Sequence, residues 1–137
     1  MSADSQWPLQ QALFAALSAD ATLQGMLGSP ARVFDHVPQD SAFPYVVIGE
    51  ATSGPFDGKT ENGMEQTLTI HAWSRYRGLK EVKQIMAAVT ASLDDQALAI
   101  SGHTLVLLRF EFAATFLDPD GMTRHGVQRF RALTQGP

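Results

Sequence analysis

The last third of the chain, residues 103–134, contains two long segments rich in hydrophobic residues, separated by Asp118-Pro119-Asp120-Gly121. Asp favours the start of a turn, Pro fixes φ at the second position, and Gly adopts a backbone conformation that other residues avoid. The pattern therefore predicts two long strands joined by a tight turn, at the end of a β-meander.

The first strand of this hairpin carries a regular alternation. One face of it holds Val106, Leu108, Phe110, Phe112, Ala114 and Phe116, and the other holds Leu105, Leu107, Arg109, Glu111, Ala113 and Thr115. Burying each phenylalanine would stabilise the fold by roughly 1.5–3 kcal/mol. The alternation therefore predicts that the phenylalanine face contributes heavily to the core.

Helical periodicity marks three further segments. Residues 8–19 place leucines on one face, Asp20 is a candidate N-cap for residues 21–27, and residues 77–93 carry the longest apolar stripe. That stripe consists of Leu79, Val82, Ile85, Met86, Val89 and Leu93. It predicts an amphipathic helix that covers one face of a sheet.

Three more strands are expected at residues 32–36, 43–53 and 64–74. In the last of these, Leu68, Ile70 and Ala72 share one face, whereas His71 and Trp73 share the other. This half-buried alternation is typical of antiparallel sheets. Residues 54–63, GPFDGKTENG, predict a polar, solvent-exposed loop.

These elements predict one α+β domain spanning residues 1–137: a mostly antiparallel sheet, a long amphipathic helix packed on one face, and a short N-terminal helical pair. The second sheet face is expected to carry Trp73, Leu105, Leu107 and Val127. Because this face is not very polar, we expect either the N-terminal helices or a neighbouring subunit to cover it.

Composition excludes several classes of function. The chain of 137 residues has a net charge of −4, whereas a free-standing nucleic-acid binder is normally basic. It has no cysteine, which excludes disulfides, thiolate catalysis and cysteine-based zinc sites. Neither a signal peptide nor an apolar run long enough to span a bilayer is expected.

Motifs of catalysis and ligand binding are absent from the sequence. There is no HExxH pattern, phosphate-binding glycine loop or nucleophile elbow. Asp118 and Asp120 resemble the start of a calcium loop, but the closing glutamate is missing, which favours the turn. His71 is expected to be a partly buried histidine bonded to a neighbour, and His125 to pair across the hairpin near Thr115 or Leu117. We therefore expect no catalytic residue, cofactor or metal.

Four blocks of the chain, taken in order, resemble siphovirus-type tail terminators, also called tail-completion or tail-to-head joining proteins. The blocks are residues 8–27, 32–53, 65–93 and 98–134. The stretches PYVVIGE, LTIHAWS and DPDGMTRHGVQRFRAL are most similar to the version found in gene transfer agents of alphaproteobacteria, which are phage-like particles encoded in the host chromosome. The specificity lies in the order and spacing of the blocks.

The resemblance implies a structural protein and not an enzyme. It implies a homo-hexameric ring that caps the tail tube, ends tube polymerisation and joins the tail to the head. The implied partners are the tail tube protein, the head stopper or connector protein, and double-stranded DNA passing through the lumen, with no membrane. Assembly would take place in the cytoplasm, after which the ring would belong to the head–tail junction of the particle.

A closed ring of identical subunits needs two different patches on each subunit. The residues expected at partner interfaces are Asp57, Lys59, Glu61, Trp73, Arg75, Arg124 and Arg129. Two alternatives remain open at this stage. One is a head-side connector, a stopper or adaptor ring, of the same particle; the other is a small ligand-binding domain with a pocket near His71 and Trp73.

Overall fold

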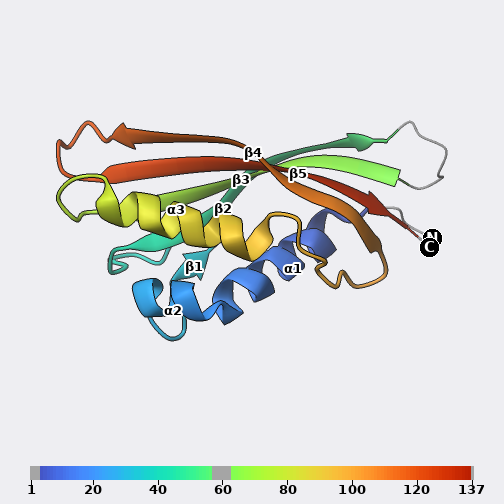
Figure 1. The fold of residues 1–137 in the computed structure, drawn as a ribbon, viewed down its shortest axis with the longest axis horizontal. Coiled ribbons are helices and arrows are strands. Elements are labelled where there is room, and N and C mark those ends of the chain that lie inside the picture. Colours follow the sequence, from blue (N-terminus) through green and yellow to red (C-terminus); the bar gives the residue numbers. More distant parts are fainter. Residues whose placement is uncertain (1–3, 57–62, 137) are drawn as a thin grey trace.

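The computed structural model describes residues 4–56 and 63–136, which form an α+β fold (Figure 1). The elements are α1 (Gln6–Ala19), α2 (Ala21–Leu27), β1 (Val33–Phe34), β2 (Tyr45–Pro55), β3 (Gly63–Ser74), α3 (Lys80–Leu93), β4 (Thr104–Leu117) and β5 (Arg124–Gln135). Their order is the predicted one. None of the helices in the described residues is long and apolar enough to cross a membrane.

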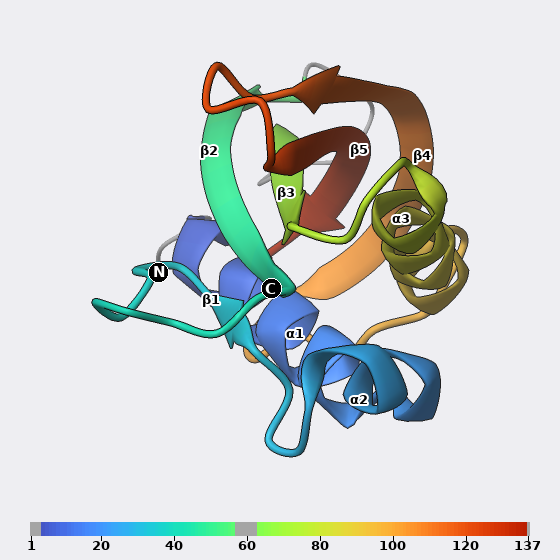
Figure 2. The same cartoon turned by 90° about the vertical axis from the view of Figure 1, so that its left-hand side faces the viewer.

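The strands form one sheet in the order β1-β2-β3-β5-β4. β1 pairs with β2 in parallel, and the other neighbours are antiparallel, which confirms a mostly antiparallel sheet. The sheet is strongly twisted, so that β4 crosses over β5 in Figure 1 and the strands curve around the helices in Figure 2.

All three helices lie on the same side of the sheet (Figures 1 and 2). α1 buries Leu9, Leu13 and Leu17, and α3 packs beside it through its buried apolar stripe. The N-terminal helices therefore do not cover the second sheet face, which corrects one of the two coverings expected from the sequence. We call this uncovered side the open face.

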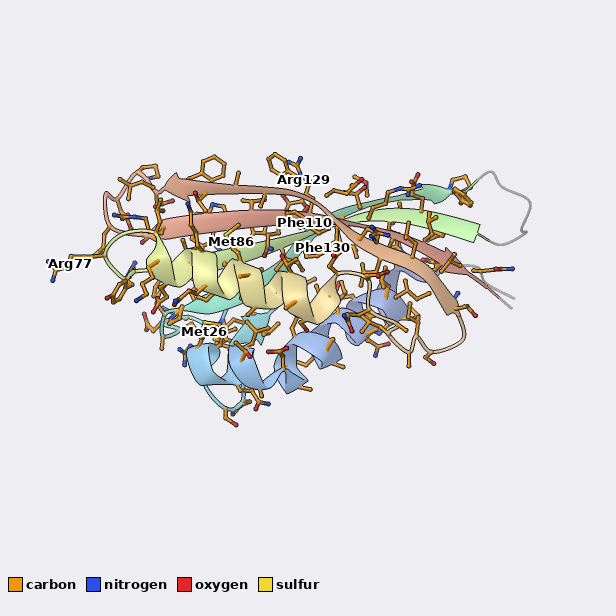
Figure 3. All side chains as sticks on the ribbon, in the orientation of Figure 1. Met26, Arg77, Met86, Phe110, Arg129 and Phe130 are labelled. Atoms are coloured by element: carbon orange, nitrogen blue, oxygen red, sulfur yellow. The ribbon has the colours of Figure 1, made fainter. Side chains whose placement is uncertain are left out.

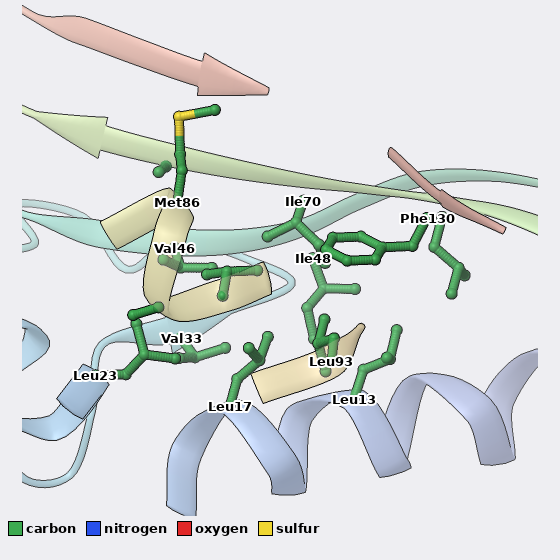
Figure 4. Close-up of a cluster of buried hydrophobic side chains, with 14 of the residues drawn as sticks. Leu13, Leu17, Leu23, Val33, Val46, Ile48, Ile70, Met86, Leu93 and Phe130 are labelled. Atoms are coloured by element: carbon green, nitrogen blue, oxygen red, sulfur yellow. The ribbon is translucent and has the colours of Figure 1, made fainter. Parts of the chain in front are cut away.

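The core lies between the helices and the sheet (Figure 4). Ile48, Ile70 and Phe130 project from three neighbouring strands toward Leu13 of α1 and Leu93 of α3. Phe130 is the largest side chain with no exposed surface. Burial of this layer is the main force that fixes the helices on the sheet.

The helix boundaries follow local chemistry. The Leu23 N–H donates to Asp20 Oδ1 at 2.9 Å, which confirms the predicted N-cap. α3 begins at Lys80 and not at residue 77, because Gly78 has φ +85°, outside the helical region. With 14 residues α3 equals α1 in length, so the expected long helix is not confirmed, although its apolar stripe is buried as predicted.

The strand boundaries differ at two places. The strand expected at residues 32–36 shortens to Val33–Phe34. Gly54, Pro55 and Gly63, expected in the polar loop, instead extend β2 and β3, because Gly54 pairs with Glu65 and Gly63 with Gln135. Asp57, Lys59 and Glu61 lie outside the described residues.

β4 corrects the expectation of a buried phenylalanine face. Register shifts between Leu105 and Leu107, and again between Phe110 and Phe112, insert one residue each. Because side chains alternate with a period of two, each insertion moves the following residues to the opposite face. Phe110 pairs with Phe130 on the helix side, whereas Phe112 and Phe116 lie on the open face and are 44% and 51% exposed.

Two buried polar contacts fix the helices lengthwise. Gln128 Nε2 donates to the Met86 carbonyl at 2.9 Å and to Thr90 Oγ1 at 2.7 Å, which joins β5 to α3. A Cβ at Gly126 would lie 2.5 Å from Met86 Sδ, so the glycine leaves room for the Met86 side chain of α3 against β5. At the other helix, Ser5 Oγ accepts from Gln66 Nε2 at 2.9 Å.

The turn between β4 and β5 has the predicted form. The Gly121 N–H donates to the Asp118 carbonyl at 2.9 Å, and Gly121 has φ +72°. Asp120 Oδ1 accepts from the Met122 and Thr123 N–H groups at 2.8 Å, and Oδ2 accepts from the Thr123 hydroxyl. The aspartates therefore act as turn residues.

Phe130→Ala is expected to lower the free energy of unfolding by about 3–5 kcal/mol, because it leaves a cavity in the core. The matched variant Phe112→Ala, on the open face, is expected to cost about 1 kcal/mol or less. Urea unfolding of both variants measures the difference. Equal losses would contradict the placement of Phe130 in the core and of Phe112 on the open face of the sheet.

Candidate interaction surface

On β3, β4 and β5, the open face consists of the residues that alternate away from the helices. Cross-strand partners share a face, so the ladder contacts define its members. They are Glu65, Thr67, Thr69, His71 and Trp73 of β3, His125, Val127, Arg129, Arg131 and Leu133 of β5, and Leu107, Arg109, Phe112, Ala114 and Phe116 of β4. Figure 3 shows Arg129 projecting away from the helices and Phe130 toward them.

A cluster of rings occupies one part of this face. The His125 ring stacks on Trp73, with centroids 3.8 Å apart and planes at 6°, and on His71 at 4.9 Å. Phe116 borders the same histidine at 6.0 Å. The stack forms because β3 and β5 place Trp73 directly opposite His125.

A hydrogen-bond chain runs through the cluster from β2 to β5. His71 Nε2 lies 2.7 Å from Glu50 Oε1, and His71 Nδ1 lies 2.7 Å from His125 Nε2. The bond between His71 Nδ1 and His125 Nε2 needs one nitrogen as donor and the other as acceptor. It therefore forms when one of these two nitrogens carries a proton and breaks when both carry one. This confirms the prediction that His71 is bonded to a neighbour.

Contacts in and around the cluster shift the pKa values of Glu50 and His125. The hydrogen bond from His71 lowers the pKa of the Glu50 carboxyl. Burial, and then the charge of His71, lower the pKa of His125, while Asp118 and Glu50 act in the opposite direction. The fold therefore favours ionised Glu50 and neutral His125.

Charged side chains on the rest of the open face are paired with neighbours. The Arg129 guanidinium lies over the Phe112 ring, 4.8 Å from its centroid, and Arg131 forms a salt bridge with Glu65. A cation held over an aromatic ring keeps both groups in a fixed arrangement. The surface thus presents aromatic and guanidinium groups in fixed positions, and not a patch of a single charge sign.

Arg75 and Arg124 lie elsewhere, at the end of the sheet that carries the β4–β5 turn. The Arg75 guanidinium lies 4.2 Å from the Phe43 ring centroid and donates to Thr123 Oγ1 at 3.2 Å. Arg124 Nη1 donates to the Met122 carbonyl at 3.1 Å. Thr123 and Met122 also hydrogen bond to Asp120, which lowers the pKa of that carboxyl to about 2.

The structure therefore separates the residues predicted at partner interfaces. Trp73 and Arg129 share the open face, whereas Arg75 and Arg124 lie at the turn end of the sheet. The sequence reading missed Glu50 and the open-face positions of Phe112 and Phe116. The sequence signal for Glu50 is its place on the strand that precedes the strand of His71. The two strands of a β-hairpin lie side by side, so the two side chains can meet.

Other features do not add a ligand site at these residues. In the described part of the chain, no three acidic or histidine side chains are arranged to hold a metal ion. A groove of about 430 Å³ lies beside α1 and is lined by Trp7, Gln10, Gln11, Phe14, Asp35 and Ile48. Both ring nitrogens of His71 are already engaged within the cluster.

A helix-backed antiparallel sheet with an uncovered, ordered aromatic face is typical of subunits that assemble with other proteins. The family model for tail completion protein gp17 matches residues 11–135. The chain therefore belongs to the tail completion protein gp17 family, which confirms the resemblance found in the sequence.

Individual relatives agree with this assignment. The tail completion protein gp17 of Bacillus phage SPP1 is 31% identical over 123 residues, 90% of this chain and 89% of the relative. A chain in the virion of a native gene transfer agent particle superposes with a TM-score of 0.85 at 30% identity, over 93% of this chain and 95% of that one. The structure of SPP1 gp17 gives 0.65 at 30% identity, over 92% and 88%.

The depressed pKa of His125 predicts a pH dependence of stability. Well above pH 6.5, His125 is neutral in both the folded and the unfolded state; as the pH falls through 6.5, the unfolded state binds the proton first. Stability is therefore expected to decrease as the pH falls from 6.5 through the folded-state pKa.

Urea unfolding at a series of pH values measures this, with His125→Phe as the comparison because it keeps a ring against Trp73. The variant is expected to lose less stability than the parent between pH 7 and the folded-state pKa. An equal slope in both proteins would assign the pH dependence to other groups.

Proposed function

We propose that the chain is a structural tail-completion protein of a phage-like particle. Six copies form a ring on the last ring of the tail tube, which ends tube polymerisation and presents a surface to the head connector. Double-stranded DNA passes through the lumen. The observation that carries the proposal is the match to a chain of the native gene transfer agent virion along 93% of the sequence.

The physical character of the surface supports assembly. Phe112 and Phe116 are exposed although they lie near the middle and end of a well-formed strand. Exposed aromatic groups backed by a rigid sheet suit contact with a protein partner. The net charge of −4 suits a conduit, since tight binding of phosphates would slow the passage of DNA.

The proposal extends to the residues predicted at interfaces. Trp73 and Arg129 would meet a partner through the open face, and Arg75 and Arg124 through the turn end of the sheet. Asp57, Lys59 and Glu61 would contact an adjoining ring or line the lumen. The whole chain would act as one domain, without catalysis, assembling in the cytoplasm before it enters the head–tail junction.

Deletion of the gene in a producer strain is expected to give separate heads and unjoined tails, with tube lengths that are no longer uniform. The physical reason is that an uncapped tube continues to add subunits and lacks the surface that the head recognises. Negative-stain electron microscopy of released particles measures both effects, and a strain complemented with the intact gene is the control.

Two other outcomes would contradict the proposal in different ways. Tails of normal length that lack heads would assign the chain to the head-side connector. Intact particles from the deletion strain would exclude a structural role in joining, and a ligand screen by thermal shift would then test the region of His71 and Trp73.

A further inference from the structure

The sheet leaves two strand edges without a partner among the described residues. β1 pairs only with Val46 and Val47, so the edge of β2 is open beyond these two residues. The ladder of β2 with β3 is irregular at residues 49–50 and regular again at 51–55, and residues 51–55 form the open edge segment of β2. At the other end of the sheet, β4 is open at residues 112–117. Just before this segment, the Asp95 N–H donates to the Leu108 carbonyl, and Asp94 Oδ1 accepts from the Phe110 N–H.

A bulge precedes each edge segment, but neither segment carries the charged side chains that protect many exposed edges against pairing. The segments read ATSGP for residues 51–55 and FAATFL for residues 112–117, without a charged side chain in either. Proteins normally blunt exposed strand edges with lysine or other charges. Pro55 limits only the far end of the first segment. Two open, uncharged edges on one subunit therefore indicate that both are covered in the assembly.

The strand directions make the two edges complementary. β3 runs antiparallel to β2, β5 runs antiparallel to β3, and β4 runs antiparallel to β5. Three reversals separate β2 from β4, so β4 runs opposite to β2. When a neighbouring copy is placed so that the sheet continues, its β2 therefore runs antiparallel to β4 of the first copy. The contact joins two different patches, which is the type of interface that closes a ring.

A groove beside the β2 edge suits the same neighbour. Trp7 and Phe14 of α1 are 60% and 47% exposed and line the groove of about 430 Å³ next to Ile48. In an antiparallel pairing, the final residue of β4, Leu117, comes to lie at the Ile48 end of β2. Leu117 is 56% exposed and lies on the helix side of the sheet, opposite Arg124, so it faces this groove.

We propose that neighbouring copies of this chain join edge to edge, with residues 112–117 of one copy adding an antiparallel strand to residues 51–55 of the next. Leu117 of the first copy fills the groove formed by Trp7 and Phe14 of the second. This inference rests on the proposed ring and specifies the contact that closes it.

Cysteine crosslinking tests the pairing, because the natural chain has no cysteine. Ala51 lies on the helix side of the sheet, opposite Leu68, so in the proposed pairing its partner must be a helix-side residue near the end of β4, either Thr115 or Leu117. Chains carrying Ala51→Cys with Thr115→Cys, and Ala51→Cys with Leu117→Cys, are incorporated into particles in place of the natural protein and oxidised.

At least one of these two chains is expected to give a ladder of linked subunits on a non-reducing gel. Ala51→Cys with Ala114→Cys is the matched control, since Ala114 points to the open face and is expected to link far less. Each single-cysteine chain is expected to give no ladder. Ala51→Cys combined with Ala87→Cys, on the exposed side of α3, controls for random collisions.

A charge placed on the edge gives a second test. Ala113→Lys is expected to reduce the yield of joined particles about tenfold or more, because pairing would bury an unpaired ammonium. Ala87→Lys, the same substitution on α3, is expected to leave the yield unchanged. Circular dichroism of both purified proteins checks that each variant folds.

The outcomes separate this inference from the proposed function. If the deletion strain fails to join heads and tails, but both helix-side cysteine pairs join normally and form no ladder, the edge pairing is wrong and the tail-completion role stands. Normal joining by Ala113→Lys would overturn the pairing in the same way. Normal joining by the deletion strain itself would overturn the function.

Discussion

The packing of α1 and α3 against a single face of the sheet is the contact on which the rest of the structure depends. Leu13, Leu93 and Phe130 meet in this layer, and all three are fully buried. Hydrophobic burial has no direction of its own, so the layer supplies stability without fixing which surface remains outside. The choice of surface comes from the strands, whose alternation sends every second side chain away from the helices.

One-sided packing has a direct consequence for assembly. The helices of the described residues all pack on one face, so the other face and two segments at the sheet edges remain uncovered. The ring stack of Trp73 and His125 keeps part of that free face ordered before any partner arrives. Order in the free subunit lowers the entropy lost on association, which favours binding by a small surface.

Much of this arrangement follows from local sequence. The alternation around Ile70 and the aspartates near Gly121 predicted a half-buried strand and a tight turn, and both are confirmed, because each depends mainly on neighbours in the chain. The face of Phe112 was predicted wrongly for the opposite reason. An inserted residue such as Glu111 leaves no local mark, since a bulge is fixed by the pairing of β4 with β5.

The candidate surface shows the same limit. Trp73 and His71 were assigned to one face correctly, but the contact between Glu50 and His71 joins positions 21 residues apart and requires the β2–β3 register. Similarly, both possible coverings of the second face were open until the position of α1 was known. Both outcomes depend on how whole strands and helices pack against one another. The conformational preferences of single residues do not determine that packing.

The fixed position of α3 on β5 bears on geometric accuracy. Gly126 leaves room for the Met86 side chain against β5, and the Gln128 side chain binds the Met86 carbonyl at one position along the strand. In a closed ring, every copy repeats the same rotation, so a small error in subunit shape is multiplied by the number of copies. In the proposed ring, a helix held at one position on the sheet would give each subunit the same wedge angle, so that the ring could close without a gap or an overlap.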